Sequence, residues 1–295
     1  MKVGLYHGCS LEASSREYLE SLRAIAPALK LELEEVQNWN CCGASSAHAM
    51  DHILALSLPA ETLAQAEQQS MKEVLVPCAA CYGRLAATKA ELAENQTLKQ
   101  QISERIEMPY AGSTEILTIL DILDKVLTAD VVKSFPQKFS HKVVCYYGCL
   151  LVRPPKITKA QRVEDPLMME DILKRIGAQP LDWGMKTECC GASFSITRTD
   201  LVGMMSGKII EDAILRGAEA IIVACPMCQS NLDMRRQAIE KAMGKRYSIP
   251  VLFITQAIGL ALGLDSSALG LKRHFVPVSL LENQEAKAVA TGKSS

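Results

Sequence analysis

Apolar residues follow two spacings along the chain, which together predict alternating strands and helices. Short apolar runs, such as residues 3–6, are typical of buried strands. Longer segments place apolar residues three and four positions apart, as Leu19, Leu22 and Ile25 do, which is the spacing of one helix face. In the first part of the chain we expect strands at 3–6, 31–36 and 73–76, and helices at 10–30, 48–70 and 82–106, with Pro59 starting a new helix.

The same order of elements returns in the second part of the chain. We expect strands at 142–147, 179–183 and 220–224, and helices at 165–176 and 200–216. Strands that alternate with helices are typical of a mainly parallel sheet with flanking helices. We therefore predict an α/β protein of two pseudo-repeated domains. The apolar run 250–264 is too short to span a membrane, so we expect a buried or subunit-facing helix there and no transmembrane segment.

Cysteines repeat with the same period as these elements. Of the 11 cysteines, all but Cys145 form two copies of one pattern: a single cysteine, an adjacent pair and a C-x-x-C pair. Neighbouring residues repeat with them, so that Tyr6-His7-Gly8-Cys9 corresponds to Tyr146-Tyr147-Gly148-Cys149. The offset of about 140 to 148 residues indicates an internal duplication. The first set is Cys9, Cys41, Cys42, Cys78 and Cys81, and the second set is Cys149, Cys189, Cys190, Cys225 and Cys228.

Chain length and the duplication together predict the domain boundaries. The chain has 295 residues, of which 48% are hydrophobic, and this is enough for two domains with cores of their own. Residues 107–140 contain no cysteine and precede the first strand of the second copy. We therefore expect a first domain at 1–140, a second domain at 141–264 and a C-terminal tail at 265–295.

Two of the three cysteine positions in each copy come directly after a predicted strand. Ligand sites of open α/β sheets form beyond the carboxyl ends of the strands. Because three separate loops carry the five thiols of each copy, the fold has to bring these loops to one place. We expect one site per domain, at the carboxyl ends of its strands.

Charge and composition narrow the possible partners and surroundings. The formal net charge is -1 at pH 7 and the basic residues are dispersed, which argues against nucleic acid as a partner. The N-terminal residues enter a strand pattern and show no secretory leader, so we expect a cytoplasmic protein. Clustered cysteines in a reducing compartment more often hold metal or take part in redox chemistry than form structural disulfides.

The spacing of the thiols favours iron over zinc. A tetrahedral zinc site needs four ligands, and the side chains of adjacent cysteines diverge too far to share one ion well. Neighbouring thiolates can reach different irons of a multi-iron centre, so iron–sulfur ligation is our first interpretation. One cluster together with one zinc ion stays open as an alternative. A thioredoxin-like role for the C-x-x-C pairs would leave the other six cysteines of the repeat unexplained.

These motifs resemble those of a known protein family. Both five-cysteine sets are similar to the cysteine-rich CCG domain, and specifically to the B subunit of heterodisulfide reductases. The likeness extends over most of the chain and includes Arg153-Pro154-Pro155-Lys156 and Ile254-Thr255-Gln256-Ala257-Ile258-Gly259-Leu260. The resemblance implies that all five cysteines of each set bind one non-cubane [4Fe-4S] cluster, which gives two clusters per chain.

An activity is also implied by the resemblance. In that family a mixed disulfide of coenzymes M and B lies between the two clusters, and each cluster would deliver one of the two electrons that break it. The motif Cys41-Cys42-Gly43 is the form carried by bacterial homologues, and bacteria generally lack these coenzymes. We therefore expect another small disulfide, or a persulfide, as the substrate.

The resemblance implies partner subunits as well. The chain has no dinucleotide fingerprint, phosphate loop or ferredoxin motif with which to collect electrons itself. The flavin-containing subunit and the small ferredoxin-like subunit of a heterodisulfide reductase-type complex would supply them. The alternative is a non-catalytic electron-relay subunit, like the CCG components of glycolate, lactate or glycerol-3-phosphate dehydrogenases.

Several other side chains are candidates for supporting roles. Cleavage of a disulfide to thiols consumes protons, so His7 and His48, both near cysteines of the first set, are candidate proton donors. Cys145 lies inside a predicted strand and outside the repeat, and we expect it to be a buried structural thiol. Three basic residues near cysteines of the second set, Arg153, Lys156 and Arg198, are candidates to bind an anionic group of the substrate or to balance the charge of a cluster, with solvated surface charge as an equal alternative.

Overall fold

Short apolar segments form two parallel sheets in the computed structural model, which describes residues 1–44, 46–278 and 280. The strand order is β2-β1-β3-β4 in the first sheet and β6-β5-β7-β8 in the second. This repeated order confirms the predicted α/β fold with two pseudo-repeated halves. The strands are β1 (Lys2–Leu5), β2 (Glu32–Glu35), β3 (Glu73–Leu75), β4 (Glu115–Leu117), β5 (Lys142–Tyr146), β6 (Gln179–Pro180), β7 (Ala220–Val223) and β8 (Val251–Phe253).

Each sheet has a fourth strand that the sequence patterns did not predict. In the first sheet β4 pairs with β3, and Val74 lies opposite Ile116. In the second sheet β8 pairs with β7, and Ile222 lies opposite Leu252. The expectation of a single helix over the run 250–264 was therefore wrong, because the start of that run extends the sheet. The helix α14 (Ile254–Ala261) begins only after β8, and all of its residues are buried.

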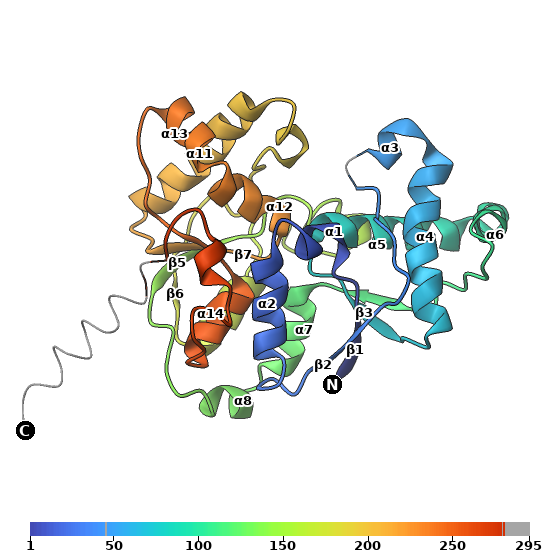
Figure 1. Ribbon diagram of the computed structural model, residues 1–295, viewed down its shortest axis with the longest axis horizontal. Helices are drawn as coiled ribbons and strands as arrows, with labels where there is room; N and C mark the ends of the chain where they lie inside the picture. The colour runs from blue at the N-terminus through green and yellow to red at the C-terminus, as the bar shows by residue number, and fades with distance from the viewer. Residues whose placement is uncertain (45, 279, 281–295) are drawn as a thin grey trace, which may run out of the picture.

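Helices join the strands and cover the sheets (Figure 1). Predicted helices break where a polar side chain caps a new one: Asp51 accepts the Leu54 N–H and Asn95 accepts the Leu98 N–H. Pro59 was expected to start a new helix, but it lies inside α4. The helix already begins at the Asp51 cap, and a proline inside a helix removes only one backbone hydrogen bond, so α4 continues through Pro59. The helices of the first half are α1 (Gly8–Glu12), α2 (Arg16–Ile25), α3 (Ala47–Met50), α4 (His52–Gln68), α5 (Ala79–Glu94), α6 (Gln96–Arg105), α7 (Ile119–Val126) and α8 (Ala129–Lys133).

The second half has a similar set of helices and adds a short π-helical turn, η2. Longer helices alternate in it with single turns that lie close to the cysteines. The elements are α9 (Pro155–Thr158), α10 (Met168–Arg175), η1 (Ala192–Phe194), α11 (Thr199–Leu215), α12 (Pro226–Gln229), η2 (Ser230–Met234), α13 (Arg236–Met243), α14 and η3 (Leu271–Arg273).

Helix α2 of the first half packs on α14 of the second half (Figure 1). The ring of Tyr18 stacks on that of Phe253 with centroids 4.0 Å apart, and its hydroxyl donates to the Ala224 carbonyl at 3.1 Å. Next to this pair, the hydroxyls of Ser21 and Thr255 are 2.7 Å apart. These buried contacts join the two halves directly below the loops that carry the cysteines.

Part of the predicted C-terminal tail packs on the second half. Leu269 and Leu271 are buried, and the carboxylate of Asp233 accepts the backbone N–H groups of Phe275 and Val276. Residues 279 and 281–295 of that prediction lie outside the described residues, and the proposed domain limits stay a prediction. Within the described ranges, no helix combines the length and the apolar character that crossing a membrane requires.

Candidate metal centres

Both cysteine sets lie where the connections of a sheet change direction. In the first sheet β1 and β3 are neighbours, so Cys9, which follows β1, and Cys78, which follows β3, come to the same edge. In the second sheet β5 and β7 bring Cys149 and Cys225 together in the same way. With the order β2-β1-β3-β4, this point is the switch point at which open α/β sheets bind ligands.

Each set has a closed inner side and an open outer side. The inner side consists of the second cysteine of the adjacent pair and both cysteines of the C-x-x-C motif, and all of these are buried. The single cysteine and the first cysteine of the pair form the outer side, and they are exposed or half-buried. The inner thiols are Cys42, Cys78, Cys81, Cys190, Cys225 and Cys228, and the outer thiols are Cys9, Cys41, Cys149 and Cys189.

Thiols meet in pairs within each set. The Sγ atoms of Cys42 and Cys81 are 3.1 Å apart, and this hydrogen bond lowers the pKa of Cys42 to about 7. In the second set, the hydrogen bond with Cys149 lowers the pKa of Cys189 to about 6. Because the thiolate is the form that binds metal, each set contains a thiol that ionises readily near neutral pH.

The inner sides of the two sets face each other across the interface between the halves. The neighbouring thiol of Cys225 is the main cause of the raised pKa of Cys78. Close by, the Oγ of Ser10 lies 4.0 Å from the Sδ of Met227, which belongs to the second C-x-x-C motif. In Figure 1 the short helices α1 and α12 accordingly lie side by side at the centre of the molecule.

Two equivalent tyrosines hold the loops of the adjacent cysteine pairs. The hydroxyl of Tyr6 donates to the Asn40 carbonyl at 2.9 Å, and that of Tyr146 donates to the Glu188 carbonyl at 2.6 Å. Each of these carbonyls directly precedes an adjacent cysteine pair. Burial, and then the nearby thiols, raise the pKa of both tyrosines. Sequence reasoning assigned them no role, although both begin a repeated word, which was the available signal.

A glycine precedes the first cysteine of each set and makes room for the C-x-x-C motif. Gly8 and Gly148 have φ angles of +66° and +65°, a region that favours glycine. A Cβ atom at Gly8 would lie 3.3 Å from the Sγ of Cys81, and one at Gly148 would lie 2.7 Å from the Sγ of Cys228. The backbone therefore leaves space beside these thiols that a larger residue would fill.

The donor set is compatible with a thiolate-ligated iron–sulfur centre. Its ten donors are all sulfur atoms, the inner thiols are buried, and the glycine backbone leaves space beside them. Among the residues that the structure describes, no three Cys, His, Asp or Glu side chains converge on a position for a single metal ion. The assignment of the two sets to two clusters stays a prediction.

The two candidate proton donors occupy different surroundings. His7 is buried, its ring lies 4.9 Å from that of Trp39, and its Nδ1 is 3.2 Å from the Gly8 carbonyl oxygen. His48 lies on α3 and is exposed. Of these two histidines, the fold keeps only His7 beside the first set in a buried position.

Of the remaining candidates outside the repeat, Arg153 and Arg198 have partners within the protein, and Lys156 is exposed. Cys145 is fully buried, as predicted. Arg153 donates to the Thr187 carbonyl at 3.1 Å, which connects the loop after Cys149 to the loop before the second adjacent pair. Arg198 is exposed and pairs with its neighbour Asp200, which is the surface-charge alternative.

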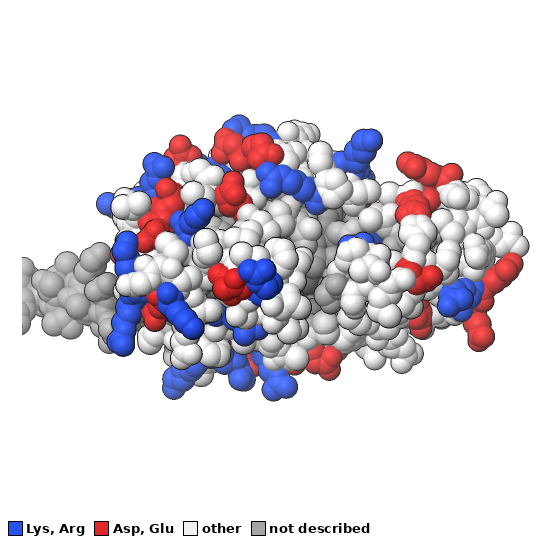
Figure 2. Space-filling view, turned by 90° about the horizontal axis from the view of Figure 1, so that it is seen from above, with Lys and Arg blue, Asp and Glu red and all other residues white. Residues whose placement is uncertain are grey.

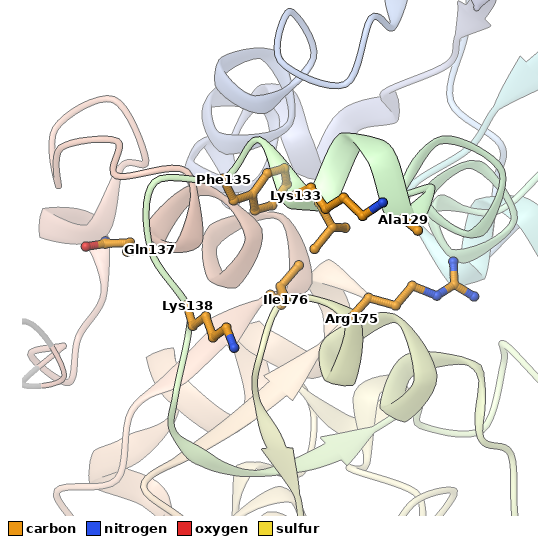
Figure 3. Close-up of a pocket in the computed structure, with 8 residues that line it drawn as sticks. Ala129, Lys133, Phe135, Gln137, Lys138, Arg175 and Ile176 are labelled. Atoms are coloured by element: carbon orange, nitrogen blue, oxygen red, sulfur yellow. The ribbon is translucent and has the colours of Figure 1, made fainter.

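A cavity of about 430 Å³ lies away from the cysteines, between α8 and the end of α10 (Figure 3). Val132, Phe135 and Ile176 contribute apolar wall. Three basic residues also line the cavity: Lys133, which is paired with Asp130, Arg175, which is paired with Asp124, and Lys138. No cysteine lines this cavity. It is therefore separate from the candidate metal centres.

Figure 2 shows the molecule from above as a left and a right lobe with a hollow between them, and few charged residues lie in this hollow. On this face Lys, Arg, Asp and Glu gather on the lobes and along the rim, and the hollow between the lobes is lined mainly by other residues. This part of the surface therefore offers few charged groups to a ligand.

Comparison with known proteins assigns the chain to a family. Residues 3–86 and 143–233 match the model of the cysteine-rich domain, CCG, and these two segments contain all ten cysteines of the repeat. The chain belongs to the CCG family. This CCG protein is 32% identical over 285 residues to the 8-methylmenaquinol:fumarate reductase membrane anchor subunit of Wolinella succinogenes, covering 95% of this chain and 99% of that one.

Other relatives of this CCG protein carry the name of the heterodisulfide reductases. It is 28% identical to the B subunit of the ferredoxin/F(420)H(2)-dependent CoB-CoM heterodisulfide reductase of Methanosarcina acetivorans, over 93% of this chain and 94% of that one. Among solved structures, a hypothetical protein from Helicobacter pylori shares the fold, with a TM-score of 0.77 and 13% identity. That match covers 94% of this chain, which spans only 52% of the solved chain.

Proposed function

We propose that this CCG protein is the catalytic iron–sulfur subunit of an oxidoreductase complex that reduces, or in reverse forms, a small disulfide or a persulfide. The relatives named as B subunits of heterodisulfide reductases support the broader role of an iron–sulfur electron-transfer subunit. The observation that carries the finer proposal is the pair of five-thiol sets, each with an open outer side, whose inner sides face each other. Two equal centres suit a two-electron reaction on one bond.

The ten thiols of the repeat would hold two non-cubane [4Fe-4S] clusters, one in each set. When bound, the clusters would supply one electron each for a two-electron bond. The buried inner thiols fix each group, and the outer thiols, Cys9 with Cys41 and Cys149 with Cys189, leave one side accessible to a small molecule. Tyr6 holds the loop of the first adjacent pair.

Protons for the product thiols would come from the first half of the molecule. His7, buried next to Gly8, is the better placed donor, and His48 is an exposed second candidate. A His7→Ala variant is expected to lose turnover and keep its iron. Loss of iron together with turnover in that variant would instead give His7 a structural role.

Partner subunits would deliver the electrons. We propose a flavin-containing partner and a ferredoxin-like partner in the cytoplasm, because the chain has no electron-collecting motif of its own. Names of relatives support membership of a multi-subunit complex, since they are given as B and D subunits of heterodisulfide reductases. Co-purification of the tagged full chain from its host would test this, and isolation of the chain alone would argue against it.

Electron paramagnetic resonance after oxidation in the presence of a thiol tests the proposed activity. With candidate thiols added to the anaerobically reconstituted protein, we expect a paramagnetic signal that depends on the thiol and is absent without it. If the iron-loaded protein shows the same paramagnetic signals with and without every thiol and persulfide tested, the site does not react with disulfides and the proposal is wrong.

A second candidate function is that of a non-catalytic electron relay. The relative that is 32% identical over nearly the whole chain is the membrane anchor subunit of a fumarate reductase, a name that refers to no disulfide. Paramagnetic signals that do not change when thiols are added, combined with fast reduction of the iron–sulfur centres by a partner subunit, would support this relay function. One cluster with one zinc ion, the mixed-metal alternative, would appear as zinc in the metal analysis.

A further inference from the structure

One of the equivalent pairs of positions beside the two centres differs in charge. Three residues after the last cysteine of each set, the first half has Arg84 and the second half has Asn231. On helix α5, Cys81 and Arg84 are three residues apart and therefore share a face. The duplication thus preserves the place of this residue beside each set and changes its charge.

In the second half this position acts on the inner cysteine of the adjacent pair. The side-chain nitrogen of Asn231 donates to the Cys190 carbonyl at 2.9 Å and lies 3.6 Å from the Cys190 Sγ. Its side-chain oxygen accepts the hydroxyl of Ser195 at 2.7 Å, so the amide is fixed at both ends. Asn231 is fully buried and neutral.

In the first half the equivalent residue acts on the equivalent cysteine with a full positive charge. Cys42 corresponds to Cys190 in the repeat, and its Sγ lies 3.1 Å from the Sγ of Cys81, which shares a face of α5 with the half-buried Arg84. Within the described part of the chain, no carboxylate forms an ion pair with Arg84.

We infer that Arg84 makes the first centre easier to reduce than the second, so that the two equally ligated centres hold electrons unequally. The inference rests on the proposed function only in requiring a redox-active centre in each set. Reduction adds one negative charge to a centre, and a nearby cation in a partly buried site stabilises that charge more than a neutral amide does. Net charge and hydrogen bonds to sulfur are established determinants of iron–sulfur potentials. Arg84 would therefore act through its charge and would not bind the centre itself.

Potentiometric titration followed by electron paramagnetic resonance tests this inference on the anaerobically reconstituted full chain. Arg84→Asn copies the second centre, Arg84→Lys keeps the charge, and Asn231→Leu is the matched control in the other half. We expect Arg84→Asn to lower one midpoint potential, with the ratio of reduced to oxidised centre falling about tenfold, or about 59 mV for one electron. The midpoint potential of the same centre should be nearly unchanged in Arg84→Lys and in Asn231→Leu.

Three results of the titration would overturn the inference. These are an unchanged midpoint potential in Arg84→Asn, an equal shift in Arg84→Lys, and a shift of both components together. Iron loss in both Arg84 variants would also overturn it, because it would show a structural role. The proposed disulfide chemistry can fail separately. If the paramagnetic signals do not respond to thiols but the midpoint potential still falls in Arg84→Asn, the disulfide proposal is wrong and the inference about Arg84 holds.

Discussion

At the scale of single residues, the glycines that precede the first cysteines control the space for each centre. An added Cβ at Gly148 would lie 2.7 Å from the Cys228 Sγ, closer than real contacts allow, whereas at Gly8 the distance to the Cys81 Sγ is 3.3 Å. We expect Gly148→Ala to reduce iron bound by the second centre severely and Gly8→Ala to have a milder effect on the first. Iron quantitation on the purified variants measures both.

A third glycine separates backbone strain from crowding in this test. Gly217 also has a positive φ, +79°, but a Cβ there would meet no atom within 4 Å. Gly217→Ala should therefore lose only about 1 kcal/mol of stability and keep all its iron. Equal iron in Gly148→Ala and Gly217→Ala would show that the space beside Cys228 is not needed by the centre.

The paired tyrosines make a second residue-scale prediction. Tyr6→Phe and Tyr146→Phe each remove one hydroxyl and leave a carbonyl, that of Asn40 or Glu188, without its donor. Each change should lower the free energy of unfolding by about 1 to 3 kcal/mol, since both hydroxyls lie in buried surroundings. Chemical denaturation of the iron-loaded variants measures the loss. An unchanged free energy of unfolding in both would contradict their role in holding the cysteine loops.

At the scale of elements, helix α2 fastens the first half to the second. Tyr18→Ala removes both the stacking on Phe253 and the hydrogen bond to the Ala224 carbonyl, and Tyr18→Phe removes only the hydrogen bond. We expect losses of about 3 to 5 kcal/mol for the alanine variant and about 1 kcal/mol for the phenylalanine variant. Calorimetry measures both, and equal losses would show that the stacked ring contributes nothing.

Elements also show which parts of the fold the sequence could predict. The long amphipathic helices and the strands before Cys9, Cys78, Cys149 and Cys225 were predictable, because their periodicity and the duplication agree. The strands β4 and β8 were missed because neither leads into a cysteine of the repeat. β4 lies in the cysteine-free segment 107–140, and β8 begins an apolar run that continues into a helix. The stacking of α2 on the second half depends on distant contacts that no local pattern encodes.

The same limits apply to the candidate site. The ten thiols could be identified from the sequence because their order and spacing are duplicated. Tyr6 and Tyr146 could not be given a role, since a hydroxyl that bonds a backbone carbonyl leaves no signature in residue type. Arg84 and Asn231 became comparable only when the structure showed that Asn231 contacts Cys190.

At the scale of the whole molecule, a buried glutamate couples stability to pH. Burial raises the pKa of Glu17 to about 7, from an ordinary value of 4.5. Between these values the unfolded chain loses its proton and the folded chain keeps it, so stability falls as pH rises from 4.5 to 7. We expect Glu17→Gln to exceed the wild type in unfolding free energy at pH 8, by an amount on the order of 1 kcal/mol, and to match it near pH 4.5.

Urea denaturation across this pH range measures the effect, with Glu20→Gln as the control. Glu20 lies on the same helix and pairs with Arg273 in a partly exposed position, so its loss should change stability by less than about 1 kcal/mol. Glu20→Gln leaves Glu17 in place, so the decline of stability with pH should persist in this variant. A Glu17→Gln variant whose stability declines with pH as steeply as the wild type would contradict the assignment.

The account depends most directly on the presence of two separate iron–sulfur centres, one for each cysteine set. Anaerobic quantitation of iron, sulfide and zinc per chain tests this, in the wild type and in a variant with Cys189→Ser and Cys190→Ser. The account predicts about eight irons and no zinc in the wild type, and about four irons in the variant. About four irons and one zinc in the wild type, or equal iron in wild type and variant, would contradict it.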